Sequence, residues 1–127
     1  MKNNMVGWFE VPVTNMERAI AFYEKVFELK LEHHPMGELE MAWFPWNEEG
    51  TGTPGTLIYY PAAYKPSTDG VLVYFTAHSG DLANELSRIE AAGGQVLQGK
   101  TQISEDHGFM ALFIDSEGNR VALHSRE

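Results

Sequence analysis

Apolar and polar residues follow one another along this chain in a pattern that predicts a strand, a helix and three further strands, twice over. In the first half, residues 7–13 favour a pleated strand. Apolar residues at three- and four-residue spacing then predict a helix from about Met16 to Glu28. Three strand-like stretches follow, at 29–34, 39–46 and 56–60, separated by turn formers.

The second half repeats this order after a connection at residues 60–70. A strand at 71–77 precedes a helix at about 81–92, and strands follow at 95–98, 109–115 and 120–125. Each half alone would leave one sheet face uncovered. We therefore expect an α+β fold in one domain, with two βαβββ modules, about 5–62 and 69–126, that form a curved mixed sheet around a cleft. A ferredoxin-like sandwich is the alternative, but it needs a second helix in each half.

The start of the first helix carries a Thr-x-x-Glu pattern, Thr14 to Glu17. In such a capping box the Thr hydroxyl and the Glu carboxylate each accept a hydrogen bond from a free backbone N–H. We therefore expect these two side chains to cap the helix.

Composition narrows the choice of partners. With 127 residues and 43% apolar content, the chain can build one globular core. Its formal charge of -9 repels phosphate backbones and anionic lipid, so we expect neither nucleic acid nor a membrane as a partner. The absence of cysteine excludes disulfides, thiolate metal sites and a thiol nucleophile. The sequence shows no membrane-spanning stretch or signal peptide, and we expect a cytoplasmic protein.

Three stretches of the chain, at residues 13–27, 86–96 and 113–123, resemble motifs of the vicinal oxygen chelate proteins, the family of glyoxalases, bleomycin resistance proteins and extradiol dioxygenases. The stretch 13–27, VTNMERAIAFYEKVF, is similar to the opening motif of that family, with Asn15 in place of the usual Asp and Glu28 in place of the usual Gly. The stretches 86–96 and 113–123 are similar to signatures of its second half. The resemblance spans nearly the whole chain and implies the tandem βαβββ fold.

The resemblance also implies where a metal would lie. Members of that family commonly hold a divalent metal with His or Glu from the first and last strands of each module. Aligned by motif, these positions fall on Trp8, Tyr59, Val71 and Ala122. None offers the imidazole nitrogen or carboxylate oxygen that such metals prefer. We therefore expect the fold without the usual metal centre and without another cofactor.

A carboxylate and an imidazole occur close to those positions. Because side chains alternate along a strand, Glu10 is expected to share the face of Trp8, and Arg120 and His124 the face of Ala122. Glu10 and His124 are therefore candidate catalytic residues, as an acid–base pair or as part of a shifted metal site. A hydrogen bond or ion pair that only satisfies two buried polar groups is the alternative.

Aromatic residues complete the predicted site. Trp8, Tyr59 and Phe75 are expected to face the cleft and to line a ligand pocket with Val71, Arg120 and Ala122. The leading hypothesis is a small-molecule-binding protein of unknown reaction, and the resemblance implies a homodimer. A divalent-metal-dependent lyase or dioxygenase that uses Glu10 and His124 is the competing hypothesis. Sequestration of a cationic compound by an acidic cleft is a third.

Overall fold

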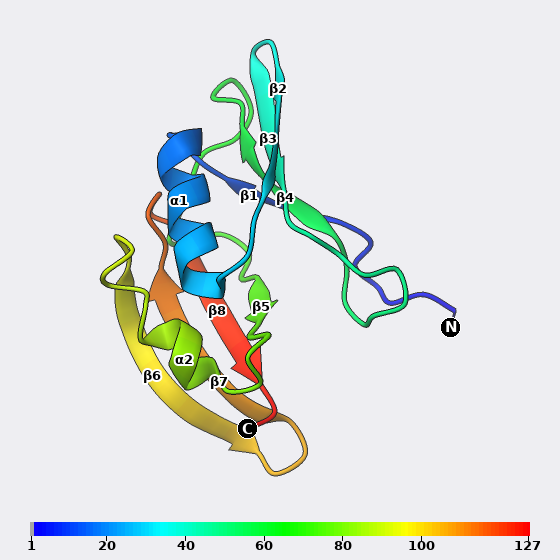
Figure 1. Cartoon of the computed structure of the whole chain (residues 1–127), viewed down its shortest axis with the longest axis vertical. Helices are drawn as coiled ribbons and strands as arrows, with labels where there is room; N and C mark the ends of the chain where they lie inside the picture. The colour runs from blue at the N-terminus through cyan, green and yellow to red at the C-terminus, as the bar shows by residue number, and fades with distance from the viewer. Residues whose placement is uncertain (1) are drawn as a thin grey trace.

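The computed structural model describes residues 2–127 and contains two units, each a strand, a helix and three strands in order (Figure 1). The first unit comprises β1 (Phe9–Pro12), α1 (Met16–Phe27), β2 (Glu32–Met36), β3 (Leu39–Trp43) and β4 (Gly55–Tyr59). The second unit comprises β5 (Tyr74–Thr76), α2 (Leu82–Leu86), β6 (Gln95–Ser104), β7 (Gly108–Ile114) and β8 (Arg120–Ser125). The predicted α+β class is confirmed.

Each unit forms a four-stranded mixed sheet. The strand order is β1-β4-β3-β2 in the first sheet and β5-β8-β7-β6 in the second. In both, the first strand of the unit runs parallel to the last, and the other neighbours are antiparallel. Because the strand order is the same, corresponding positions of the two units can be compared directly.

Several elements differ from the sequence prediction in their bounds. β2 lies at Glu32–Met36 instead of 29–34, and β3 ends at Trp43 instead of residue 46. α2 ends at Leu86 because the N–H groups of Arg88 and Ile89 bond carbonyls three residues back, which continues the chain in tighter turns. β5 begins only at Tyr74. β6 extends to Ser104 because it pairs with β7 as far as that residue. Its mainly polar second half, residues 99–104, has no apolar alternation that would predict a strand. No helix among residues 2–127 is long and apolar enough to cross a bilayer.

The helix-facing sides of both sheets share one apolar core. Phe75 of β5 lies at its centre, with its ring centroid 5.4–5.7 Å from those of Phe9, Tyr23, Phe27 and Phe44. These rings come from both units, so neither unit has a separate interior. Buried residues of the second sheet, including Ala111, Phe113, Val121 and Leu123, belong to the same core.

The start of α1 is held by the second unit. Asn15 is the N-cap, since its side chain accepts a hydrogen bond from the N–H of Arg18 at 3.1 Å. The carboxylate of Glu117 accepts bonds from the N–H groups of Thr14 and Asn15, both at 2.9 Å, and from Nε of Arg18 at 2.8 Å. The capping-box prediction for Thr14 and Glu17 is therefore wrong, because a carboxylate from a distant part of the chain satisfies the free N–H groups.

These contacts set the charge state of Glu117. Its side chain is 0% exposed, and burial alone would raise the pKa of its carboxyl. The hydrogen bonds from Arg18, Asn15, Thr14 and Ser116 outweigh burial and lower the pKa to about 2. Glu117 is therefore an ionised buried group that depends on its donors.

Side-chain hydrogen bonds hold the turn at residues 115–119. Oδ1 of Asp115 accepts the N–H groups of Glu117 and Asn119, and Nδ2 of Asn119 donates to the carbonyl of Pro12 at 2.7 Å. The buried hydroxyl of Tyr23 donates to Oδ2 of Asp115 at 2.7 Å. Burial and the charge of Asp115 raise the pKa of Tyr23 well above its ordinary value, so the hydroxyl keeps the proton that it donates.

Candidate functional site

The candidate site lies on the outer face of the first sheet, which we define as the side that points away from the shared core. Val11 and Leu57 belong to the core, so alternation places Glu10 and Thr56 on the outer face. Glu10 pairs with Thr56, and Thr56 pairs with Trp43 on the other side of β4. These three residues therefore form one row across β1, β4 and β3.

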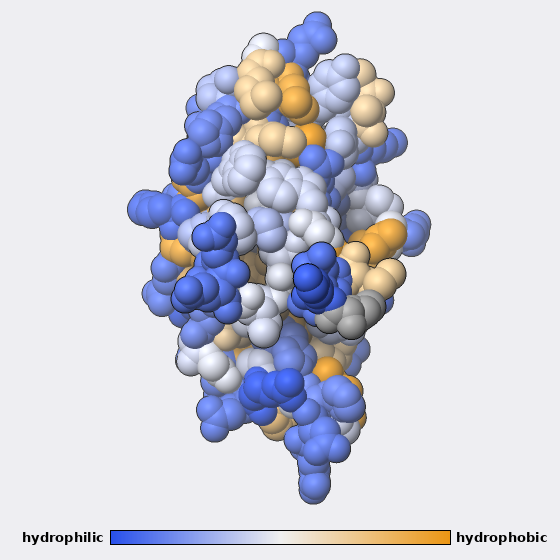
Figure 2. Space-filling view, turned by 90° about the vertical axis from the view of Figure 1, so that its right-hand side faces the viewer, coloured by the Kyte–Doolittle hydropathy of each residue, from blue (hydrophilic) through white to orange (hydrophobic). Residues whose placement is uncertain are grey.

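A pocket of about 670 Å³ opens on this outer face. Glu10 and Glu38 contribute carboxylates, and Tyr60 and Tyr64 contribute phenol rings. The other lining residues are apolar: Met36, Leu39, Met41, Ile58 and Ala63. On the side of the molecule away from α1, hydrophobic residues gather in the upper part, above a central area of intermediate hydropathy (Figure 2). This volume and composition suit a small organic molecule.

Glu10 is the polar side chain around which this pocket is organised. The hydroxyl of Tyr64 donates to Oε1 of Glu10 at 2.6 Å, and Nε1 of Trp8 donates to Oε2 at 3.4 Å. The hydrogen bond to Glu10, together with burial and the carboxylate charge, raises the pKa of Tyr64. The phenol therefore stays protonated at neutral pH and acts as the donor. Tyr64 reaches Glu10 because the chain turns back after β4, where its N–H bonds the carbonyl of Tyr60.

Two tryptophans meet across the sheet. The ring centroids of Trp8 and Trp43 lie 4.8 Å apart in an edge-to-face arrangement. Trp8 directly precedes β1 and Trp43 ends β3, while β4 lies between these strands. The rings therefore span the strand that carries Thr56. Oγ1 of Thr56 is buried and has no hydrogen-bond partner among residues 2–127.

Three of the predicted site residues do not face a common cleft with Trp8. Tyr59 follows the alternation of Leu57 and packs against the core, so the prediction that it shares a face with Trp8 is wrong. Phe75 is a core residue, 8% exposed, and the prediction that it lines a cleft is also wrong. Val71 precedes β5 and is 93% exposed, so it lies outside the strand to which the sequence assigned it.

The predicted residues of β8 have the expected orientation. Val121 and Leu123 belong to the core, so Arg120, Ala122 and His124 point away from it. Ala122 is 0% exposed. Nε2 of His124 is 2.6 Å from the carbonyl of His107, to which it donates.

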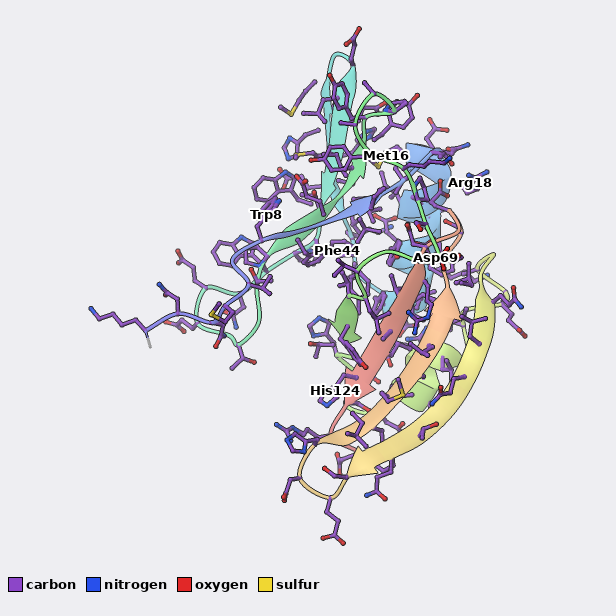
Figure 3. The ribbon with its side chains drawn as sticks, turned by 180° about the vertical axis from the view of Figure 1, so that it is seen from behind. Trp8, Met16, Arg18, Phe44, Asp69 and His124 are labelled. Carbon is purple, nitrogen blue, oxygen red and sulfur yellow. The ribbon has the colours of Figure 1, made fainter. Side chains whose placement is uncertain are left out.

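Glu10 and His124 are not brought together. They belong to different sheets, and Trp8, the neighbour of Glu10 on the outer face, lies well apart from His124 (Figure 3). The hydrogen-bond partners of Glu10 are Tyr64 and Trp8. The predicted contact between this carboxylate and this imidazole, as an acid–base pair or a buried ion pair, is therefore wrong within one chain.

The side chains at the positions of the usual metal ligands do not fit a metal. The indole of Trp8 only donates, Val71 and Ala122 have no ligating atom, and Tyr59 is on the core side of its sheet. Among residues 2–127, no group of three or more His, Asp or Glu side chains is placed to hold a metal ion. The donor set therefore disagrees with the metal that the resemblance implies.

The sequence alone does not identify Tyr64, Thr56 and Trp43 as residues of the site. Tyr64 lies in the stretch predicted to connect the two halves. The only signal in the sequence that could have pointed to it is the presence of three tyrosines within six residues, at 59, 60 and 64. Thr56 and Trp43 join Glu10 through strand register, which one sequence does not reveal.

A family model described as Glyoxalase/Bleomycin resistance protein/Dioxygenase superfamily matches residues 5–123. No curated protein matches the chain. TnmS3, an antibiotic binding protein from Streptomyces sp. CB03234, is 23% identical with a TM-score of 0.66, over 100% of this chain and 99% of that one. A glyoxalase/bleomycin resistance protein from Albidiferax ferrireducens T118 is 18% identical with a TM-score of 0.67, over 98% and 100% of the two chains.

Glyoxalase I from Zea mays is 20% identical, with a TM-score of 0.66. The match covers 94% of this chain but 45% of that one, so the chain spans about half the length of the Zea mays protein. At these identities the likeness to solved structures shows a shared fold.

Proposed function

Because this chain belongs to the glyoxalase/bleomycin resistance protein/dioxygenase superfamily, we propose that it binds a small organic molecule in the outer-face pocket, without the usual metal centre of the family. The observation that carries the proposal is the pocket of about 670 Å³, with a mainly apolar lining that includes the carboxylate of Glu10. Small-molecule sites are usually built in this way, with a few polar groups that orient a ligand among apolar walls.

The full-length likeness to TnmS3, an antibiotic binding protein, supports a binding role. It shows that a chain of the same size and fold serves as a binding protein. The proposal names no reaction. A homodimer and a cytoplasmic location stay predictions from the sequence.

The competing metalloenzyme hypothesis gains no support from the geometry. It requires Glu10 and His124 as shared ligands, and these side chains belong to different sheets and bond other groups. The two hypotheses differ in a direct measurement. Elemental analysis of the purified protein is expected to find no stoichiometric divalent metal, and a stoichiometric metal that is needed for ligand binding would contradict the proposal.

Binding can be tested with 4-phenylbutanol as a probe. A ligand with about 11 heavy atoms gains roughly 0.3 kcal/mol per atom, which corresponds to a Kd of about 4 mM. Chemical-shift changes of ¹⁵N-labelled protein measure such affinities, and the shifts are expected on β1, β3 and β4.

Two neighbouring alanines give a matched pair of variants. Ala63 and Ala62 are both exposed in the turn after β4, and of the two only Ala63 lines the pocket. Ala63→Trp is expected to fill the pocket and weaken 4-phenylbutanol binding at least fivefold, whereas Ala62→Trp should leave it unchanged. Equal binding by both variants, or no binding by the native chain, would refute the proposed site.

A further inference from the structure

The buried hydroxyl of Thr56 is the polar group of the outer face that the fold does not explain. An unpaired hydroxyl that is shielded from water is a cost to the stability of the folded state. Valine has nearly the same shape and suits a strand equally well, without that cost. We therefore expect the hydroxyl of this threonine to form a hydrogen bond with a bound group that is not part of the chain.

The carboxylate of Glu10 has accepting capacity beside this hydroxyl. Its Oε1 receives the short bond from Tyr64 at 2.6 Å, whereas its Oε2 receives the indole N–H of Trp8 at 3.4 Å, a long hydrogen bond. Glu10 and Thr56 are paired neighbours on adjacent strands, which lie about 4.8 Å apart. One donor group bound between them can therefore reach both oxygens.

Aromatic rings cover the same place. Trp8 and Trp43 meet across β4, and Trp8 is 36% exposed at the end of the segment before β1. Displacing the Trp8 ring would uncover Thr56 and would free Oε2 of Glu10. The faces of indole rings attract cations, most strongly among the aromatic side chains.

We infer that Glu10, Thr56, Trp8 and Trp43 form a subsite for a protonated amine at the margin of the proposed pocket. The ammonium donates one N–H to Oε2 of Glu10 and another to Oγ1 of Thr56, and the indole rings pack against the charge. A quaternary ammonium carries no N–H for Thr56, and a ligand carboxylate is repelled by Glu10. This inference rests on the proposed function, since it defines the charged group of the ligand whose apolar part fills the pocket.

The test compares three probes that share one apolar part. These are 4-phenylbutylamine, 4-phenylbutanol and (4-phenylbutyl)trimethylammonium, titrated into ¹⁵N-labelled protein. The amine is expected to bind about tenfold tighter than the alcohol and at least threefold tighter than the trimethylammonium compound. It should also shift the indole N–H resonance of Trp8, because that ring must move.

Variants separate the subsite from the pocket. Thr56→Val is expected to keep the affinity for the alcohol and to reduce the preference for the amine to threefold or less. Glu10→Gln should abolish the preference. Thr76→Val is the matched control, because Thr76 is an exposed threonine on β5, the strand that corresponds to β1 in the second unit. It should change neither affinity.

Each result has one meaning. If the alcohol binds and the amine is not preferred, or if Thr56→Val keeps the full preference, the amine subsite is wrong and the proposed pocket stands. If neither the alcohol nor the amine binds the native chain, both the proposed pocket and the amine subsite are wrong. Loss of the preference in Thr56→Val with an unchanged affinity for the alcohol supports the subsite, and it also shows that the variant is folded.

Discussion

Replacing Glu117 with Gln measures how strongly the second unit holds the start of α1. The carboxylate is fully buried and its pKa is about 2, against an ordinary value of 4.5. At about 1.36 kcal/mol for each pH unit, this difference of about 2.5 corresponds to about 3.4 kcal/mol. Because the folded-state pKa is depressed, the contribution is present above pH 4.5 and is lost as the pH falls toward 2. At pH 3 about 1.4 kcal/mol is left.

Urea unfolding followed by tryptophan fluorescence at pH 7, 5, 4 and 3 gives the free energy of unfolding for the native chain and for Glu117→Gln. Glu117→Gln is expected to lose about 3 kcal/mol at pH 7 and roughly half of that at pH 3. Glu17→Gln, an exposed change in the same helix, serves as the control and should lose less than about 0.5 kcal/mol. A loss for Glu117→Gln below about 1 kcal/mol at pH 7, or one that is equal at pH 7 and pH 3, would refute the reasoning.

Two further substitutions test backbone positions by the same unfolding measurement. A Cβ at Gly55 would lie 2.3 Å from Cδ1 of Phe9, so Gly55→Ala is expected to displace that ring and to cost about 1–3 kcal/mol; an unchanged stability would show that the ring moves freely. Glu28 ends α1 with a φ of 54°, in the left-handed region that favours glycine, so Glu28→Gly should stabilise the protein by roughly 1 kcal/mol. The ion pair of Glu28 with Arg88 at 3.7 Å is exposed and contributes little, so a destabilised Glu28→Gly would contradict this expectation.

Local patterns predicted the parts of the fold that depend on nearby residues. The apolar stripe of α1 follows from the spacing of its apolar residues, and it is present. The alternation of β1 and β8 was also predicted, and Glu10, Arg120 and His124 have the expected orientation. Each of these predictions needs only the periodicity of one helix or strand and one residue of that element that is expected to be buried.

The faces of β4 and β5 could not be predicted in this way. A shift of one residue moves a side chain to the opposite face of a sheet, and Tyr59 lies next to Ile58, which is on the outer face. Phe75 belongs to the core because rings from the first unit surround it, which the sequence of β5 does not indicate. The distance between Glu10 and His124 likewise depends on how the two sheets are placed.

The helix cap contributed by Glu117 has a consequence for synthesis on the ribosome. The N–H of Thr14 has its hydrogen-bond acceptor in Glu117, which the ribosome adds 103 residues later. A nascent chain with only the first unit therefore exposes an incomplete helix end and half of a core. Loop closure over such a separation slows folding, so this protein should depend on protection from aggregation until its second half has been made.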